Sequence, residues 1–313
     1  DGVGKEHTTA IFPISIFKVK EKVNYFKEDP NYDLFRLACK VSAKRLFPNF
    51  SFLDSSFNKP NLVDGNFDTE VGYMGCRTRV LANVCGPSVT PGRGNLSFTS
   101  IHLPRLGIKH GIALGEREKA DMKGFYEELD EMLELVKGQL LQRFEFQCSK
   151  SKANFKFLLG SGVWLNSEKL EQGGKLRTIL KHGTLSIGFI GLAETLKALV
   201  GEHHGESDKT QKLGIEIISH MRKVIDGFTE KENLNFTLLA TPAEGLSGRF
   251  VAIDRSIYGK IKGVTDREYY TNSFHVPVYY KTTIQHKLEI EGTYHKFTNA
   301  GHISYIELDG DTV

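Results

Sequence analysis

The chain has 313 residues, of which 25% are charged and 40% are hydrophobic. This is typical of one large globular domain or two ordinary ones with a sizeable core. The formal net charge is only +3, and no dense block of Lys and Arg occurs, so the charge gives no support for binding to nucleic acid or to a membrane. A nucleotide triphosphate needs only a local positive site and stays compatible with this charge.

The four cysteines, which are Cys39, Cys76, Cys85 and Cys148, form no CxxC pair. Reduced thiols and a cytoplasmic location are therefore expected. No apolar run approaches the roughly 18 residues of a membrane helix. The sequence begins without Met or a basic signal region and ends abruptly, which indicates an internal piece of a longer chain.

The first third of the chain has few regular elements. The apolar residues 10–18 predict a buried strand, although Pro13 is unfavourable in one. Apolar spacing predicts a helix over 32–47, which Pro48 ends. Residues 54–95 show no period and are dense in Gly, Pro, Asn and Asp. A long irregular segment inside a compact domain is usually functional or disordered.

The rest of the chain alternates helices and strands. We expect a helix over about 116–146, a strand over 184–189, a helix over roughly 191–200, a helix over about 209–228, a strand over 235–240, a helix starting near Pro242, and several extended segments over 274–308. No internal repeat occurs. This alternation predicts an α/β fold with a largely parallel sheet.

Gly75-Cys76-Arg77 lies inside the irregular segment. Nearby cations stabilise a thiolate, and glycine allows close approach of a ligand, so Cys76 is a candidate activated thiol. A small buried hydrophobic cysteine is an equally good interpretation of the residues alone.

Two further segments are candidates for ligand contacts. Asn95 follows Gly92-Arg93-Gly94 and can bind a sugar hydroxyl, although a bond within its own turn is the simpler interpretation. Thr241-Pro242-Ala243-Glu244-Gly245 follows a predicted strand, and Pro242 suits a first helical position. Free N–H groups at such a helix start suit phosphate, but strand-turn-helix corners are common in α/β proteins.

Other patterns are weaker. His203-His204 and the Glu216/His220 pair lack any cysteine pair or His-Glu-x-x-His motif, so surface histidines are expected rather than a metal site. Trp164 is most simply a core residue.

Ordered segments across nearly the whole chain resemble the catalytic subunit of class III (anaerobic) ribonucleoside-triphosphate reductases. These segments are Ile11-Phe-Pro-Ile, Pro30-Asn-Tyr-Asp-Leu-Phe, Asp68-Thr-Glu-Val, Met74-Gly-Cys-Arg-Thr-Arg, Gly92-Arg-Gly-Asn-Leu-Ser-Phe-Thr, Leu103-Pro-Arg-Leu, Gly188-Phe-Ile-Gly-Leu-Ala-Glu-Thr, His203-His-Gly-Glu-Ser, Thr241-Pro-Ala-Glu-Gly-Leu-Ser-Gly-Arg-Phe and Thr298-Asn-Ala-Gly-His-Ile-Ser-Tyr.

The resemblance implies part of a ten-stranded α/β barrel, made of two parallel half-barrels around a central finger loop. Residues 1–69 would end the first half-barrel, residues 70–96 would form the finger loop with Cys76 at its tip, and residues 97–313 would belong to the second half-barrel. A thiyl radical at Cys76 would start ribose reduction, and a barrel interior shields such a radical. The implied catalytic residues are Cys76, Asn95 and Glu244, and the implied substrate-binding residues are Met74, Arg77, Thr78, Thr241, Pro242, Ala243 and Gly245.

The implied cofactors are a glycyl radical and zinc, both held outside this chain, with formate or a thiol system as reductant. The implied partners are a ribonucleoside triphosphate substrate, dNTP and ATP effectors, a radical-SAM activating enzyme and a second subunit in a homodimer. Because the radical loop and the zinc CxxC pairs are missing here, residues 1–313 alone are expected to be inactive. The alternatives are a pyruvate formate-lyase type enzyme, disfavoured because Arg77 follows Cys76, and a nucleotide-binding module without chemistry.

Overall fold

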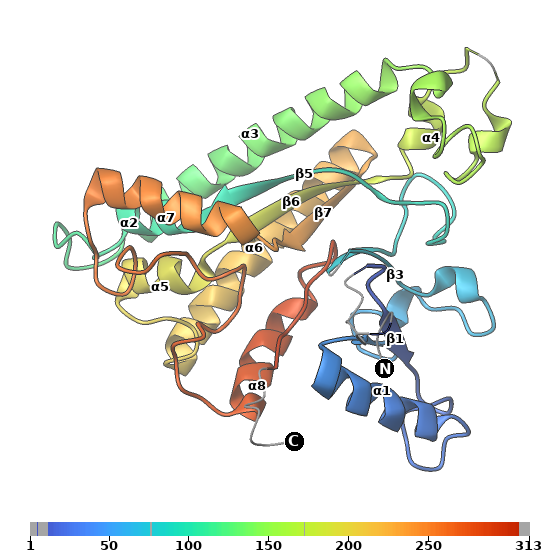
Figure 1. Cartoon of the computed structure of the whole chain (residues 1–313). Coiled ribbons are helices and arrows are strands. Elements are labelled where there is room, and N and C mark those ends of the chain that lie inside the picture. The colour runs from blue at the N-terminus through green and yellow to red at the C-terminus, as the bar shows by residue number, and fades with distance from the viewer. Residues whose placement is uncertain (1–4, 6–11, 76, 172, 307–313) are drawn as a thin grey trace.

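The computed structural model describes residues 5, 12–75, 77–171 and 173–306. A small part near the N-terminus and a larger part around a three-stranded sheet make up the molecule (Figure 1). Within the described ranges, none of the helices combines the length and the apolar character that crossing a bilayer requires.

The small part is a β-α-β unit. Strands β1 (Ile16–Val19) and β2 (Asn49–Phe52) pair in parallel, and helix α1 (Tyr32–Arg45) connects them. The helix ends at Arg45, three residues before Pro48, and its C-cap Leu46 has a left-handed φ of 69°. A proline disfavours helical backbone in the residue before it, which explains a stop ahead of Pro48.

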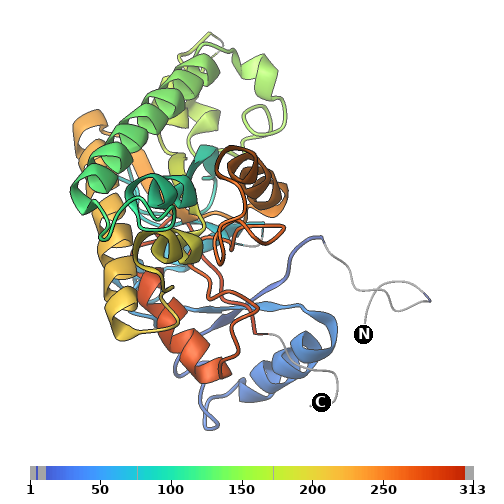
Figure 2. The same cartoon turned by 90° about the vertical axis from the view of Figure 1, so that its left-hand side faces the viewer.

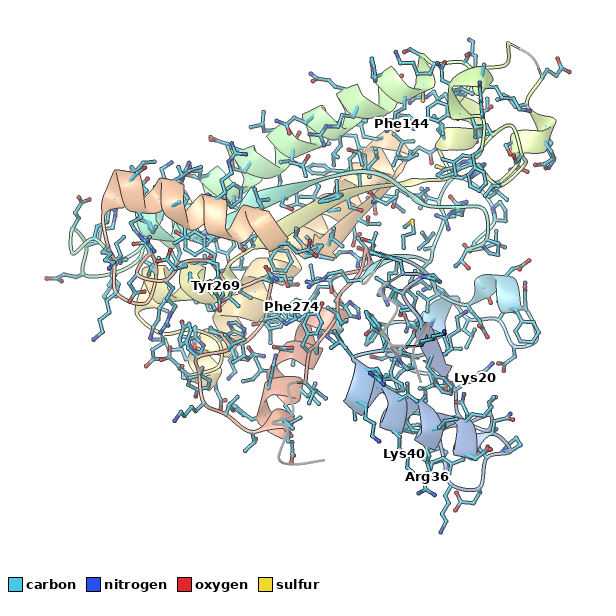
Figure 3. The ribbon with its side chains drawn as sticks, in the orientation of Figure 1. Lys20, Arg36, Lys40, Phe144, Tyr269 and Phe274 are labelled. Atoms are coloured by element: carbon cyan, nitrogen blue, oxygen red, sulfur yellow. The ribbon has the colours of Figure 1, made fainter. Side chains whose placement is uncertain are left out.

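Two expectations for this part need correction. The strand predicted over 10–18 begins only at Ile16, and Val19 is its one buried residue; positions 10 and 11 lie outside the described residues. The apolar face expected on α1 is also only partly buried, because Ala38 is covered while Leu34 and Leu37 are exposed. Figure 3 shows Arg36 and Lys40 on this helix and Lys20 near it.

The segment expected to be irregular is largely so. It contains the short 3₁₀ turns η1 (Lys59–Asn61) and η2 (Phe67–Thr69) and one small antiparallel hairpin. The hairpin consists of β3 (Gly72–Met74) and β4 (Thr78–Val80). We call the described residues 72–75 and 77–80 the hairpin.

The main sheet has the strand order β5-β6-β7, and both pairings are parallel, which confirms the predicted topology. Its strands are β5 (Asn95–His102), β6 (Thr184–Ile190) and β7 (Asn235–Ala240). The connections contain α2 (Leu103–His110), α3 (Met122–Cys148), η3 (Lys152–Phe155), η4 (Ser167–Lys169), α4 (Arg177–Leu180), α5 (Leu192–Val200) and α6 (Asp208–Glu232).

Helices α3 and α6 lie side by side on one face of this sheet (Figure 2). The side chain of Asp121 accepts a hydrogen bond from Gly124 N at 3.0 Å and so caps α3. The helix buries one face at a spacing of three and four residues, through Phe125, Leu129, Leu133, Val136, Leu140 and Phe144. Burial of each such side chain contributes about 1.5–3 kcal/mol. Figure 3 marks Phe144 near the end of this face, and Trp164 is a core residue as expected.

The last part of the chain holds α7 (Glu244–Tyr258) and α8 (Ile284–His295). The extended structure expected over 274–308 was therefore wrong for twelve residues. The buried face of α8 includes the carboxylate of Glu291, which contacts His275 and Lys287. Because a charged residue occupies the core-facing side, the apolar period that signals a helix is broken.

Candidate functional site

The face of the main sheet opposite α3 and α6 is polar. Alternate residues of β6 join the apolar core, namely Leu185, Ile187 and Phe189. Because successive side chains of a strand point to opposite faces, Thr184, Ser186 and Gly188 face the other side. A small number of polar groups converging at one place in an otherwise apolar interior is a feature of ligand sites.

Asn95 is at the centre of a hydrogen-bond network on this polar face. Its Nδ2 donates to Thr184 Oγ1 at 3.0 Å and to Ser186 Oγ. Ser186 Oγ in turn lies 2.9 Å from Thr237 Oγ1. The simpler interpretation of Asn95, a bond within its own turn, was therefore wrong, since its side chain reaches across to the neighbouring strand.

The hairpin approaches the same face. Cys76 itself lies outside the described residues, but residues before and after it contact the sheet. The backbone N–H of Asn95 points to Met74 Sδ at 3.2 Å. On the other side, Arg77 Nη1 donates to the carbonyls of Ala240 and Thr241, both at 3.3 Å.

The candidate residues thus form two groups at opposite ends of the sheet. Asn95 is in register with Thr184, which is in register with Asn235. Thr241 follows six positions after Asn235, so the two groups lie about 20 Å apart along the strands at roughly 3.3 Å per residue. The sheet alone does not bring Asn95 and Glu244 together, and the hairpin contacts both groups.

Sequence patterns missed the contribution of residues 298–301. Gly301 bridges both Thr78 of the hairpin and Leu239 of β7. Its φ is 133°, and a Cβ there would collide with the backbone carbonyl of Arg77, so only glycine allows this approach. The Thr298-Asn-Ala-Gly segment was the available signal, because an isolated glycine can mark close backbone contact.

The loop expected to hold phosphate follows the carboxyl end of β7. Helix α7 starts at Glu244 and not at Pro242, because Ala243 takes a left-handed φ of 51°. No side chain caps this helix, so its first N–H groups remain available, and a Cβ on Gly245 would meet nothing within 4 Å. Both features suit a bound anion.

Three arginines around the hairpin are buried without a carboxylate partner among the described residues. Arg77 and Arg79 are each 2% exposed, and Arg93 is 8% exposed. Their donors meet backbone carbonyls and the side chain of Asn58. Burial lowers the pKa of Arg79 and Arg93 to about 10, so both are charged at pH 7. The interior beside the hairpin is therefore positive, which favours a polyanionic ligand.

Glu244 is exposed at the start of α7 and lines a cavity of ≈ 320 Å³. Glu194 of α5, Ser247 of α7 and the segment 267–287 also line it. Figure 3 shows Tyr269 and Phe274 on this segment. The cavity lies where β6 and β7 lead into their helices, the end of a parallel sheet that commonly binds ligands.

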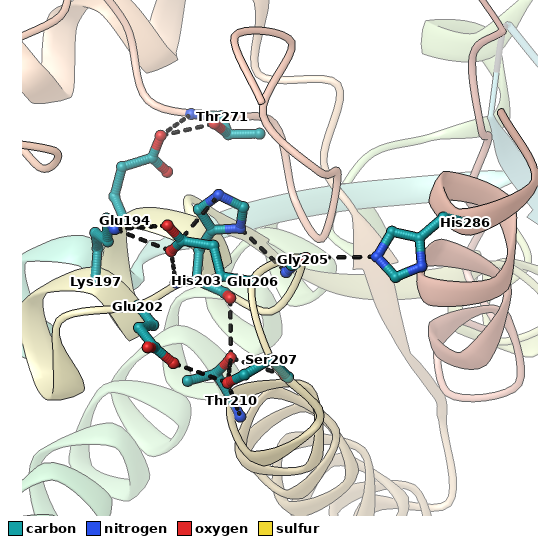
Figure 4. Close-up of polar contacts among 10 residues, drawn as sticks. All are labelled: Glu194, Lys197, Glu202, His203, Gly205, Glu206, Ser207, Thr210, Thr271 and His286. Carbon is teal, nitrogen blue, oxygen red and sulfur yellow. Dashed lines mark hydrogen bonds and ion pairs between the residues drawn. The ribbon is translucent and has the colours of Figure 1, made fainter. Parts of the chain in front are cut away.

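His203 and His204 are not surface residues, as their sequence context suggested; each is 1% exposed. His203 Nδ1 accepts from Gly205 N at 3.0 Å, and His204 Nε2 lies 2.8 Å from the carbonyl of Phe274 (Figure 4 shows the first of these). Both imidazole rings are therefore buried and hydrogen-bonded to the backbone of the protein. In the described part of the chain, no group of three or more His, Cys, Asp or Glu residues is arranged to hold a metal ion.

These buried histidines predict acid sensitivity. Burial lowers the pKa of His203 and His295 to about 4 and that of His204 to about 3, from an ordinary value of 6.5. Below pH 6.5 the unfolded chain therefore binds more protons than the folded one. The contribution of these histidines to the free energy of unfolding is complete above pH 6.5 and is lost as the pH falls toward 4. Each group contributes a slope of up to about 1.4 kcal/mol per pH unit. Urea unfolding at pH 7.5 and pH 5.0 measures this loss, and equal midpoints would contradict it.

Comparison with known proteins identifies the family. The family model described as anaerobic ribonucleoside-triphosphate reductase matches residues 1–312. The chain is 34% identical to the Escherichia coli (strain K12) anaerobic ribonucleoside-triphosphate reductase, over 98% of this chain and 41% of the relative. It is 33% identical to that of Enterobacteria phage T4, over 98% of this chain and 48% of the relative. The chain therefore spans less than half the length of these relatives.

Solved structures agree with the fold. A crystal structure of the Thermotoga maritima anaerobic ribonucleotide reductase, with MES in the active site, matches at a TM-score of 0.64 and 18% identity. The match covers 97% of this chain and 45% of that one. The parallel sheet and its helices are accordingly part of an α/β barrel, as the resemblance implied. This chain belongs to the anaerobic ribonucleoside-triphosphate reductase family.

Proposed function

We propose that this chain is the catalytic core of an anaerobic reductase that converts ribonucleoside triphosphates to deoxyribonucleoside triphosphates. The observation that carries the proposal is the hairpin, whose residues on either side of position 76 contact Asn95 at one end and Thr241 at the other. The positive interior around Arg77 and Arg93 supports a polyanionic substrate. The relatives support this reaction over a pyruvate formate-lyase type and over a module without chemistry.

In this proposal, Cys76 as a thiyl radical removes the 3′ hydrogen atom of the ribose. The 2′ hydroxyl then takes up a proton and leaves as water. The reductant, which is formate or a thiol system, gives two electrons, C2′ takes up a second proton, and Cys76 returns the hydrogen atom to C3′. A glycyl radical outside this chain supplies the oxidising equivalent.

Asn95 binds a ribose hydroxyl in the proposed complex. Glu244, expected as a catalytic residue, starts α7 at the opposite end of the strands, so the sheet geometry does not support a contact of Glu244 with the same sugar. Free N–H groups at the start of α7 hold phosphate. The substrate-binding set is Met74, Arg77, Thr78, Thr241, Pro242, Ala243 and Gly245. In the structure, the guanidinium of Arg77 is occupied by carbonyls and Thr78 is bridged to Gly301, so these two act on the substrate chiefly by fixing the loop.

The proposed organisation has residues 1–69 ending a first half-barrel, 70–96 as finger loop and 97–313 in the second half-barrel. Zinc ligands lie outside this chain in this proposal. A radical-SAM activating enzyme, a homodimeric assembly, dNTP and ATP effectors and a cytoplasmic location complete it. The Thermotoga maritima enzyme, whose structures include one with dATP in the specificity site and one with dATP and CTP, supports nucleotide effectors.

The test is an anaerobic assay of the full-length protein with its activating enzyme, a reductant and each ribonucleoside triphosphate. Deoxyribonucleoside triphosphates are expected as products, and deuterium at C3′ should slow their formation. Nucleotide binding without any deoxynucleotide would contradict the proposal in favour of a binding module.

A further inference from the structure

The hydroxyl groups of β6 occupy positions where apolar side chains are the norm. Strands of a parallel sheet are covered on both faces and usually read as continuous hydrophobic runs. β6 is buried along its whole length, yet it contains Thr184 and Ser186, which are 3% and 0% exposed. Burying a hydroxyl costs free energy unless it is hydrogen-bonded, so these residues need a reason beyond core packing.

Both hydroxyls are hydrogen-bonded to one side chain. The Nδ2 of Asn95 carries two hydrogens, and its two acceptors are Thr184 Oγ1 at 3.0 Å and Ser186 Oγ. Thr237 Oγ1, at 2.9 Å, gives the Ser186 hydroxyl a partner on the third strand. With both donors used, Oδ1 is the side-chain atom of Asn95 that remains to bind a ligand, and it can only accept.

The backbone of Asn95 is fixed independently. The pairing of β5 with β6 shifts register between Asn95 and Ser97, which is the signature of a β-bulge. Bulges commonly redirect a side chain next to an active site. The N–H of Asn95 also points to Met74 Sδ, which links its position to the hairpin. Asn95 is partly buried, and among the described residues its Oδ1 accepts no hydrogen bond, so we take Oδ1 as the atom left for a ligand.

We propose that Thr184 and Ser186, supported by Thr237, are positioning residues that hold the Asn95 amide with Oδ1 toward a hydroxyl of the ribose. The three strands thereby make the site specific for a ligand that donates a hydrogen bond at this point. This inference rests on the proposed function and deepens it, because it assigns how the sugar hydroxyl is selected.

The experiment compares Thr184→Val, which keeps the shape and removes the hydroxyl, with Thr184→Ser, which keeps the hydroxyl. Two quantities are measured in the full-length protein: kcat/KM for a ribonucleoside triphosphate, and the competitive inhibition constant of its 2′,3′-dideoxy analogue. Thr184→Val should lower kcat/KM about 5- to 10-fold, the usual effect of one hydrogen bond, and leave the inhibition constant unchanged. Thr184→Ser should keep kcat/KM near the wild-type value.

Thr195→Val is the matched control. It removes another fully buried hydroxyl, which donates to the carbonyl of Gly191, the residue before α5, and has no contact with Asn95. Once the rates are corrected for the fraction of folded protein, this variant should change neither kcat/KM nor the inhibition constant. In an Asn95→Ala background, Thr184→Val should cause no further loss, because the residue it positions is gone.

Equal behaviour of Thr184→Val and Thr184→Ser would overturn the inference. So would a parallel change in the inhibition constant of the dideoxy analogue, or a full additional loss in the Asn95→Ala background. In each of these cases the wild-type protein still reduces its substrate, and the proposed function stands. Absence of reduction by the wild-type protein would instead contradict the proposed function itself.

Discussion

Replacing Cys76 with alanine is expected to abolish ribonucleotide reduction in the full-length protein while nucleotide binding persists. Removal of a residue that forms the reactive species typically lowers kcat by four or more orders of magnitude. The binding groups are separate from the thiol, because the positive charge comes from Arg77 and Arg93 and the free N–H groups from α7. Anaerobic turnover and equilibrium binding of the same nucleotide measure the two effects.

The other cysteines provide controls for this experiment. Burial raises the pKa of the thiols of Cys39 and Cys148, the latter to about 11, so neither is an activated thiolate. Cys39→Ala and Cys148→Ala should therefore retain most of the activity. Persistence of reduction in Cys76→Ala, or its loss in Cys39→Ala, would remove Cys76 from the proposed role.

Replacing Gly188 with alanine is expected to impair both stability and substrate binding. A Cβ at this position would lie far inside the contact distance to Oγ1 of Thr241 and 2.8 Å from Oγ of Ser100. These two hydroxyls also hydrogen-bond each other at 2.7 Å. Alanine at position 188 would therefore displace Thr241, which begins the loop 241–245 expected to hold phosphate. Overpacking of this kind costs about 1–3 kcal/mol.

Displacement of Thr241 should also raise KM for the nucleotide beyond what the lost stability explains. Steady-state kinetics and urea unfolding separate the two effects. The double variant Gly188→Ala/Thr241→Ala lacks Oγ1 of Thr241 and should recover part of the stability that Gly188→Ala loses. Failure of the double variant to regain any stability would show that the clash with Thr241 is not the cause.

Gly138→Ala and Gly227→Ala serve as matched controls. Both glycines lie inside long helices, and an added Cβ would meet nothing within 4 Å. Alanine in a helix interior is favoured over glycine by about 0.5–1 kcal/mol. These variants should therefore unfold at an equal or higher urea concentration and keep their activity, whereas Gly188→Ala should unfold at a lower urea concentration and have a raised KM.

The strands β6 and β7 and the long helices around the main sheet followed from local sequence, whereas β5 and the short helices α2 and α4 were not among the elements whose bounds were predicted. The strand predicted over 235–240 matches β7, and the predicted helices over 191–200 and 209–228 match α5 and α6 within a few residues. These elements bury one clear apolar face, so local periodicity and tertiary packing demand the same conformation. The family also followed from ordered sequence segments, and the comparisons confirmed it.

Sequence reasoning failed where polar residues were buried. His203 and His204 were expected at the surface, and α8 was missed because Glu291 lies on its core side. A single side chain does not reveal whether its hydrogen-bond partners come from distant segments. In this chain they do, because His204 bonds Phe274, seventy positions away.

The candidate site also combines features that the sequence predicts with features that only the tertiary structure shows. The amino-acid sequence by itself determined the parallel α/β architecture, the family and the candidate residues Cys76, Asn95 and Thr241. Only the tertiary structure decided that Asn95 and Thr241 lie at opposite ends of the strands, and that two hydroxyls of β6 bind the Asn95 amide while Thr237 of β7 supports one of them. The physical reason is that strand order and register depend on contacts between residues far apart in the chain, which local periodicity does not encode.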